Sequence, residues 1–272
     1  AVSGMSICAM CLLSAKKHAM AQSELIQAID HFLELLRDAP YSELATLPKI
    51  SGEKLLENTL KLNKFNVSED SFGKIISLKN QNAVALTYYR NNILHLFALP
   101  GLIAAIVFAH KGLAKKQILL MVAKLYPLLK RELFIYMNED QAAEYTESLL
   151  SKMLEMGLFE TNKTEIQPPP ANTKAFYSSW LLNRSIQETL HRYAVVLTLL
   201  SRQEQVSRAE LERKSAQFAE RLSALHGINS PEFFDKKVLA TFINALKENA
   251  LIEAGDDGKL RHSKQSEALR TD

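Results

Sequence analysis

Residues 235–261 read DKKVLATFINALKENALIEAGDDGKLR and predict a helix followed at once by a β-hairpin. Apolar side chains recur at helical spacing over residues 235–249 and give that helix one buried face. The face consists of Leu239, Phe242, Ile243 and Leu246. Segments 251–252 and 259–261 then flank Asp257-Gly258, a pair that favours a tight hairpin turn.

The same helix–hairpin pattern occurs twice more upstream. The predicted first strands align at Phe65, Leu158 and Leu251, so the copies are 93 residues apart. An apolar helical segment precedes each copy, in residues 9–13, 102–108 and 195–200. Recurrence of this kind indicates a repeated supersecondary module. The sequence therefore predicts a mainly α protein with short β-hairpins, built from three tandem winged-helix-like modules.

Local signals mark the helix ends in the first two copies. The first has a predicted helix over residues 53–62 and a hairpin over residues 65–78. In the second, Asn138 can cap a helix whose third residue is Gln141, and Gly157 can end that helix.

The third copy has the clearest helix start. Residues 207–210 form a capping box, and Val206 with Leu211 forms a hydrophobic staple. His226-Gly227 can end the helix, because glycine accepts the left-handed conformation of a C-cap. The predicted apolar stripe is Leu211, Phe218, Leu222 and Leu225.

These copies set the predicted domain boundaries. Residues 1–82 form the first module, and residues 83–170 combine apolar helices with the second. Residues 171–262 hold a linker helix with the third module, and residues 263–272 form a disordered tail. Pro168-Pro169-Pro170 marks a linker, because prolines donate no ladder hydrogen bonds and do not continue a helix.

Composition excludes several classes of protein. A net charge of +3 does not by itself indicate nucleic acid or an acidic membrane as a partner. Cys8 and Cys11 are the only cysteines, which excludes a disulfide framework and fits a reducing compartment. Their CxxC spacing lacks two further zinc ligands, so both are interpreted as small core residues in the apolar run 5–13. The sequence predicts no metal or cofactor.

The longest run without Asp, Glu, Lys or Arg near mid-chain is residues 93–109. Its 17 residues include His95, Pro100 and Gly101 and fall short of the roughly 20 that a membrane span needs. A buried helix pair is the favoured interpretation, and an interfacial segment is the alternative. The chain begins with Ala1 and lacks a secretory signal pattern, so it is interpreted as a fragment.

Winged-helix modules raise the possibility of DNA binding through the helix before the hairpin. In the second module that helix is acidic, with Lys152 as its one cation, and would repel phosphates. Its acidic residues are Glu139, Asp140, Glu144, Glu147 and Glu155. Docking to protein is therefore favoured over nucleic acid.

The sequence carries no self-contained active-site motif: GxGxxG, GxSxG and HExxH are all missing. Its histidines are scattered, and no catalytic residue is assigned.

Several blocks carry a resemblance to a known family. They are residues 37–42, 62–65, 87–93, 125–130, 132–134, 188–190, 192–194 and 219–236. Together they resemble the C-terminal region of bacterial glycerol-3-phosphate 1-O-acyltransferases, from about residue 8 to 260. The resemblance implies a parent enzyme that moves an acyl group from acyl-CoA or acyl-carrier protein to glycerol 3-phosphate, the first step of phospholipid synthesis. It also implies a location at the cytoplasmic face of the inner membrane.

The resemblance transfers no catalytic residue. The family uses an HxxxxD motif, in which the histidine is a general base and the aspartate orients it. Five residues after each of the seven histidines here, no aspartate occurs. The chain alone is therefore expected to be inactive, and the missing N-terminal acyltransferase part is its expected partner.

Two groups of residues are candidates for docking on that domain or on the membrane surface. Tyr88, Tyr89, Arg90, Asn91 and Asn92 precede the apolar run. Lys111, Lys115 and Lys116 follow it. The alternative for the first set is a helix start whose polar groups cap backbone donors. Arg90 could instead pair with a carboxylate or a lipid phosphate. The alternative for the three lysines is a solvated turn.

The leading hypothesis is a non-catalytic accessory region, structural or regulatory, of an acyltransferase. The competing hypothesis is a free-standing winged-helix module that binds protein or nucleic acid.

Overall fold

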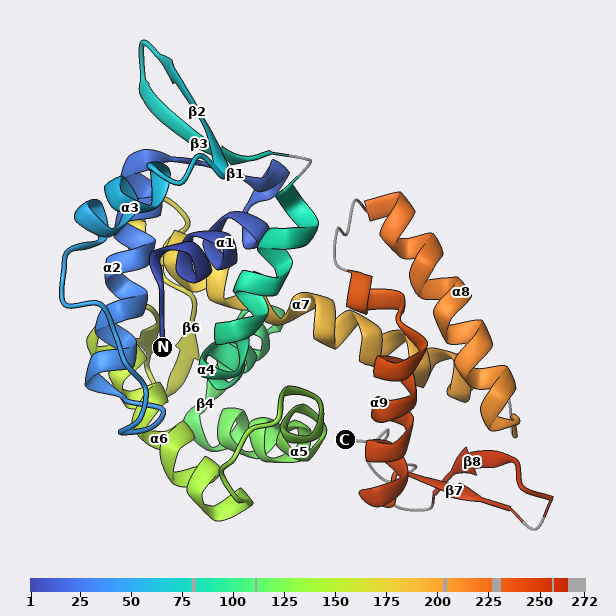
Figure 1. The fold of residues 1–272 in the computed structure, drawn as a ribbon. Coiled ribbons are helices and arrows are strands. Elements are labelled where there is room, and N and C mark those ends of the chain that lie inside the picture. The colour runs from blue at the N-terminus through green and yellow to red at the C-terminus, as the bar shows by residue number, and fades with distance from the viewer. Residues whose placement is uncertain (80–81, 111, 203–204, 227–230, 256, 264–272) are drawn as a thin grey trace. The chain divides into compact units, whose positions relative to one another are not determined.

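The computed structural model describes residues 1–79, 82–110, 112–202, 205–226, 231–255 and 257–263. The chain is mostly helical with small antiparallel sheets, which confirms the predicted class (Figure 1). It divides into two compact units. Unit 1 comprises residues 1–124 and 137–186, and unit 2 comprises residues 125–136 and 187–272.

The first part of unit 1 alternates helices with a small sheet. Its elements are α1 (Gly4–Ser14), η1 (Lys16–His18), β1 (Ala19–Ala21), α2 (Gln22–Asp38), α3 (Gly52–Leu60), β2 (Phe65–Asp70) and β3 (Gly73–Leu78). The antiparallel sheet has the order β1-β3-β2. Met20 pairs with Ile76, and Phe65 pairs with Leu78. These four side chains are buried, so the base of the β2–β3 hairpin belongs to the core.

The second part of unit 1 repeats this order of elements. They are α4 (Ala83–Ala109), β4 (Leu113–Ala114), α5 (Lys115–Leu133), α6 (Glu139–Glu155), β5 (Glu160–Asn162) and β6 (Glu165–Gln167). The sheet order is β4-β6-β5, and Leu113 pairs with Ile166. Helices α5 and α7 (Lys174–Ser201) each continue into unit 2.

Unit 2 carries the remaining elements. They are α8 (Arg208–His226), η3 (Pro231–Phe234), α9 (Lys236–Glu248), β7 (Ile252–Ala254) and β8 (Leu260–His262). Strands β7 and β8 pair, and an isolated bridge joins Val206 to Leu260. Both bridge residues are buried, so the chain before α8 lies against the hairpin.

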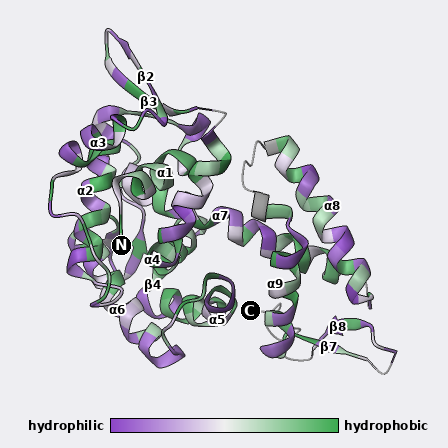
Figure 2. Ribbon diagram, in the orientation of Figure 1, coloured by the Kyte–Doolittle hydropathy of each residue, from purple (hydrophilic) through white to green (hydrophobic). Residues whose placement is uncertain are grey.

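Helices α1 and α4 form the centre of unit 1 and pack against each other. Helix α1 is apolar on nearly every side, and the buried part of α4 over residues 93–107 is apolar apart from His95. Figure 2 shows green turns in both helices, with purple turns in α4 as well. Cys8 and Cys11 are fully buried in α1, as the sequence predicted. Burial raises the pKa of the Cys8 thiol to about 12 and raises that of Cys11 well above its ordinary value. Both thiols are therefore protonated core side chains.

The expected pair of helices over residues 93–109 is wrong, because α4 continues unbroken through Pro100. Proline removes one hydrogen bond from the ladder. Phe97, Leu99 and Leu102 around it are buried, and this burial offsets that loss. In the described part of the chain α4 is the one helix long and apolar enough to cross a membrane. A core helix passes the same test, and 78% of the most apolar 18-residue stretch of α4 is buried inside the protein.

Helix caps agree with the sequence in the second copy. The Asn138 side chain accepts from Gln141 N at 2.8 Å, and the Gln141 side chain accepts from Asn138 N at 2.9 Å. Gly157 ends the helix region with φ of +69°, a conformation in which glycine carries no Cβ penalty.

The third copy agrees in part. Ser207 Oγ accepts from Glu210 N at 3.2 Å, which is half of the capping box. The Glu210 carboxylate instead contacts Lys214 Nζ at 2.7 Å. Leu225 was expected on the buried stripe but is 67% exposed. Gly227 lies outside the described residues, as do residues 264–272 of the predicted tail, whereas Ser263 is buried.

Candidate docking site

The predicted docking residues 88–92 lie inside α4, in its second and third turns, and not ahead of it. The helix starts at Ala83, because Ala83-Val84-Ala85-Leu86 already continues the apolar pattern and contains no Gly or Pro. Their interpretation as a helix start is therefore wrong.

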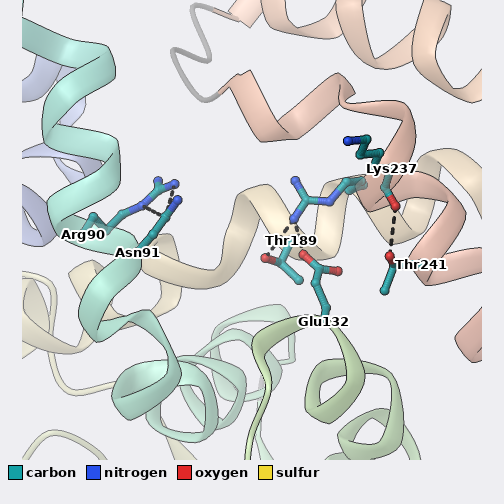
Figure 3. Close-up of polar contacts among 7 residues, drawn as sticks. Arg90, Asn91, Glu132, Thr189, Lys237 and Thr241 are labelled. Atoms are coloured by element: carbon teal, nitrogen blue, oxygen red, sulfur yellow. Dashed lines mark hydrogen bonds and ion pairs between the residues drawn. The ribbon is translucent and has the colours of Figure 1, made fainter.

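These five residues face in different directions. Tyr88 is 62% exposed, Tyr89 is 41% exposed, and Asn92 is exposed. Arg90 is buried, and its Nε and Nη2 both donate to Asn91 Oδ1 at 3.2 Å (Figure 3). The two tyrosines and Asn92 are thus available to a partner, whereas Arg90 is not.

The predicted lysines differ in their surroundings as well. Lys115 Nζ lies 2.7 Å from Glu147 Oε1 of α6, so its charge is partly neutralised. Lys116 is exposed. Lys111 lies outside the described residues.

Unit 2 contains a buried ionic cluster that sequence reasoning did not assign. Arg192 of α7 donates to Glu132 of α5 and, at 3.3 Å, to Thr189 Oγ1 (Figure 3). The Glu132 and Arg192 side chains are 8% and 6% exposed. Buried charges are tolerated only when paired, so this contact ties residues 125–136 to α7 within unit 2.

Tyr193 extends the cluster into the apolar core of unit 2. Its ring stacks on Phe242 of α9 with centroids 4.0 Å apart and planes 4° apart. Burial, and then the negative charge of Glu132, raise the pKa of the Tyr193 hydroxyl well above its ordinary value. The hydroxyl is therefore neutral at physiological pH.

One histidine–serine pair in unit 1 resembles a catalytic dyad in composition. His31 Nδ1 lies 2.8 Å from Ser178 Oγ. Ser178 is 1% exposed, so no substrate reaches its hydroxyl. Burial, the larger effect, lowers the pKa of His31 against the opposing charges of Glu34 and Asp30. The pair is a buried structural hydrogen bond.

Two open grooves lie in unit 1. The larger, about 900 Å³, lies beside α2 and is lined by residues that include Asp30, Arg37 and Glu43. The smaller, about 600 Å³, lies between α3 and the β2–β3 hairpin. Neither lining contains a histidine or cysteine. Among the described residues no group of three His, Cys, Asp or Glu is placed to hold a metal.

The family model for the glycerol-3-phosphate acyltransferase C-terminal region matches residues 1–255. The chain belongs to this family.

Three curated relatives of the glycerol-3-phosphate acyltransferase C-terminal family carry the name glycerol-3-phosphate acyltransferase. The protein of Pseudoalteromonas atlantica is 66% identical over 99% of the chain. Those of Alteromonas mediterranea and Aeromonas hydrophila subsp. hydrophila are 51% and 42% identical over 100% and 94% of it. The chain spans about a third of the length of each relative, 33%, 33% and 31%.

Membership of this family confirms the resemblance seen in the sequence. Two of the blocks that carried it, residues 132–134 and 192–194, contain Glu132, Arg192 and Tyr193. Sequence reasoning quoted these residues without assigning them a role, because nothing local indicates that residues 60 positions apart meet in one core.

Proposed function

We propose that this chain is the non-catalytic carboxy-terminal region of a glycerol-3-phosphate 1-O-acyltransferase and positions the acyl-transferring part of that enzyme. The observation that carries the proposal is the family match along residues 1–255, together with relatives that are about three times longer. The buried His31–Ser178 pair and the two grooves without histidine support a scaffold role, because the HxxxxD mechanism of the family uses an accessible histidine as its general base.

The scaffold consists of three tandem winged-helix-like modules, with predicted boundaries at residues 82, 170 and 262. The sheet orders β1-β3-β2 and β4-β6-β5 support the first two. For the third, the support is the β7–β8 hairpin and the Val206–Leu260 bridge, which takes the place of a third strand. Residues 20, 113 and 206 hold this position in the three copies and are again 93 apart.

The first two modules act by docking to protein and not to nucleic acid. Helix α6 has Glu139 and Asp140 in its first turn, and in α3 Glu57 lies 2.6 Å from Lys54 and 3.0 Å from Lys61. Neither helix offers the positive field that phosphate binding requires. A free-standing module that binds nucleic acid is therefore the weaker candidate.

The parent enzyme transfers an acyl group from acyl-CoA or acyl-carrier protein to the 1-hydroxyl of glycerol 3-phosphate at the cytoplasmic face of the inner membrane. The partners of the chain are the rest of that polypeptide and the membrane surface. Tyr88, Tyr89, Asn92 and Lys116 are exposed for such docking.

Acylation of labelled glycerol 3-phosphate with palmitoyl-CoA tests the proposal. The 272-residue chain alone should form no labelled product. The Pseudoalteromonas atlantica relative truncated before the matched region should lose activity, and co-expression with the present chain should restore part of it. Turnover by the chain alone, or full activity of the truncated relative, would contradict the scaffold role. In a duplex-DNA gel shift at physiological salt the chain should not retard the probe.

A further inference from the structure

Acidic residues are absent from two long parts of the sequence. Residues 71–131 contain nine lysines or arginines and no aspartate or glutamate. Residues 1–22 contain Lys16 and Lys17 and likewise no acidic residue. In a chain with 33 basic and 30 acidic residues, this is a marked separation of charge.

The first sheet brings the ends of these segments together. Strand β1 begins directly after η1, and Ala19 pairs with Ser77. Strand β2 begins directly after Lys64, and Phe65 pairs with Leu78. Lys16, Lys17, Lys64 and Lys79 therefore lie at one end of the sheet, which we call the basic corner.

One hydrogen bond links two chain segments of this corner, and a second attaches the start of α4 to it. Lys79 Nζ donates to Asn63 O at 2.9 Å, and Asn82 Nδ2 donates to Lys64 O at 3.1 Å. Figure 1 shows the base of the β2–β3 hairpin next to the first turn of α4.

Three lysines of the corner have no ion-pair partner among the described residues. Lys16, Lys17 and Lys64 are exposed, and no described carboxylate lies within ion-pair distance of them. This contrasts with Lys61, which Glu57 neutralises. Glu69 and Asp70 lie at the far end of β2, about 15 Å along the strand by its rise of roughly 3.3 Å per residue.

The surface beside the corner is aromatic and uncharged. On the first turns of α4, Val84 is 48% exposed, Tyr88 62% and Tyr89 41%. These residues lie within about 10 Å of Asn82, given a rise of 1.5 Å per helical residue. Unpaired lysines next to exposed tyrosines are the composition found at membrane–water interfaces, where tyrosine sits at headgroup depth.

We propose that the basic corner, together with Tyr88 and Tyr89, is a docking surface for a bilayer rich in anionic phospholipids. The inference deepens the proposed membrane docking and rests on it, but assigns the contact to Lys16, Lys17 and Lys64, while Lys79 joins two segments of the corner through its hydrogen bond to Asn63 O. These lysines replace Lys115, whose charge Glu147 partly neutralises. The lysines hold the headgroup phosphates by charge, and the tyrosines enter the interface.

Vesicle co-sedimentation of the 272-residue chain tests this surface. Binding should be strong with phosphatidylcholine vesicles that contain a quarter phosphatidylglycerol, weak with phosphatidylcholine alone, and weaker at 500 mM than at 50 mM salt. The triple variant K16Q/K17Q/K64Q should bind tenfold to a hundredfold more weakly, on the order expected for three interfacial lysines. The variant Y88A/Y89A should lose the binding that persists at high salt.

A matched control separates position from net charge. K236Q/K237Q/K247Q removes the same number of exposed lysines from α9 and should bind as the unsubstituted chain does. Circular dichroism verifies that all variants are folded. Equal loss in both triple variants, or no preference for phosphatidylglycerol, would overturn the proposal. So would a complete lack of vesicle binding, which would direct the search to an acidic protein partner. Sedimentation requires no acyl transfer, so its failure leaves the proposed scaffold role standing.

Discussion

Arg131 and Glu132 are neighbours in the sequence with opposite surroundings. Arg131 Nη2 contacts Glu248 Oε1 at 3.2 Å with both side chains more than half exposed, at 55% and 54%. Glu132 is buried with Arg192. An exposed pair is screened by water, whereas a buried charge that loses its partner keeps its full desolvation cost. The adjacent positions therefore offer a direct comparison.

Arg192→Met should destabilise unit 2 by about 3–5 kcal/mol, because Glu132 is left buried without its partner. The double variant E132L/R192M should lose less than R192M alone. Urea unfolding followed by circular dichroism gives the free energies of all three. Arg131→Met is the control and should cost less than about 1 kcal/mol. Equal effects of R131M and R192M would show that burial of the pair is immaterial.

Two histidines of unit 1 predict acid sensitivity. Burial lowers the pKa of His31 and that of His95. The unfolded chain then takes up protons at a higher pH than the folded chain, so the free energy of unfolding falls as pH drops through about 6.5. Between pH 7 and pH 5 the decrease in the free energy of unfolding should be smaller in H31Q than in the unsubstituted chain, and smallest in H31Q/H95Q. Chemical denaturation at each pH measures it, and unchanged slopes would refute the assignment.

At the scale of elements, the packing of α4 determines unit 1. A Cβ on Gly101 would lie 3.1 Å from Leu182 O and from Ser185 Oγ of α7. Such contacts are tighter than ordinary side-chain packing, so α4 and α7 approach each other at a residue that must be small.

Gly101→Ala should lower the stability of unit 1 by about 1–3 kcal/mol through overpacking. A loss of stability would point to overpacking, because helix propensity alone favours alanine over glycine by about 1 kcal/mol and would raise the stability. Thermal unfolding followed by circular dichroism measures the change. Gly112→Ala serves as the comparison, since its Cβ would first meet the mobile end of the Glu165 side chain, and should have a small effect. Stabilisation by G101A would show that α7 moves aside.

On the scale of the whole molecule, the two compact units make separate stabilities measurable. Trp180, the one tryptophan, belongs to unit 1, whereas the Glu132–Arg192 pair belongs to unit 2. In urea, the unfolding midpoint followed by Trp180 fluorescence should shift in G101A and stay within error in R192M. Circular dichroism reports the unfolding of both units. If R192M shifts the fluorescence midpoint equally, the units unfold as one because α5 and α7 continue through both.

The amino-acid sequence alone determined the mainly α class, the hairpins near residues 65–78 and 252–262, the Asn138 and Gly157 helix ends and the family. These features depend on local periodicity, capping groups and turn residues within a few positions of one another. The sequence did not decide which of the candidate docking residues face outward: Arg90 is buried, whereas Tyr88 is exposed.

Only the tertiary structure decided that α4 runs through Pro100, that Glu132 meets Arg192, and that Lys17, Lys64 and Lys79 share one end of a sheet. Each depends on residues far apart in the chain. The burial energy of a continuous core outweighs the helix-breaking tendency of one proline, and strand pairing sets which distant lysines become neighbours.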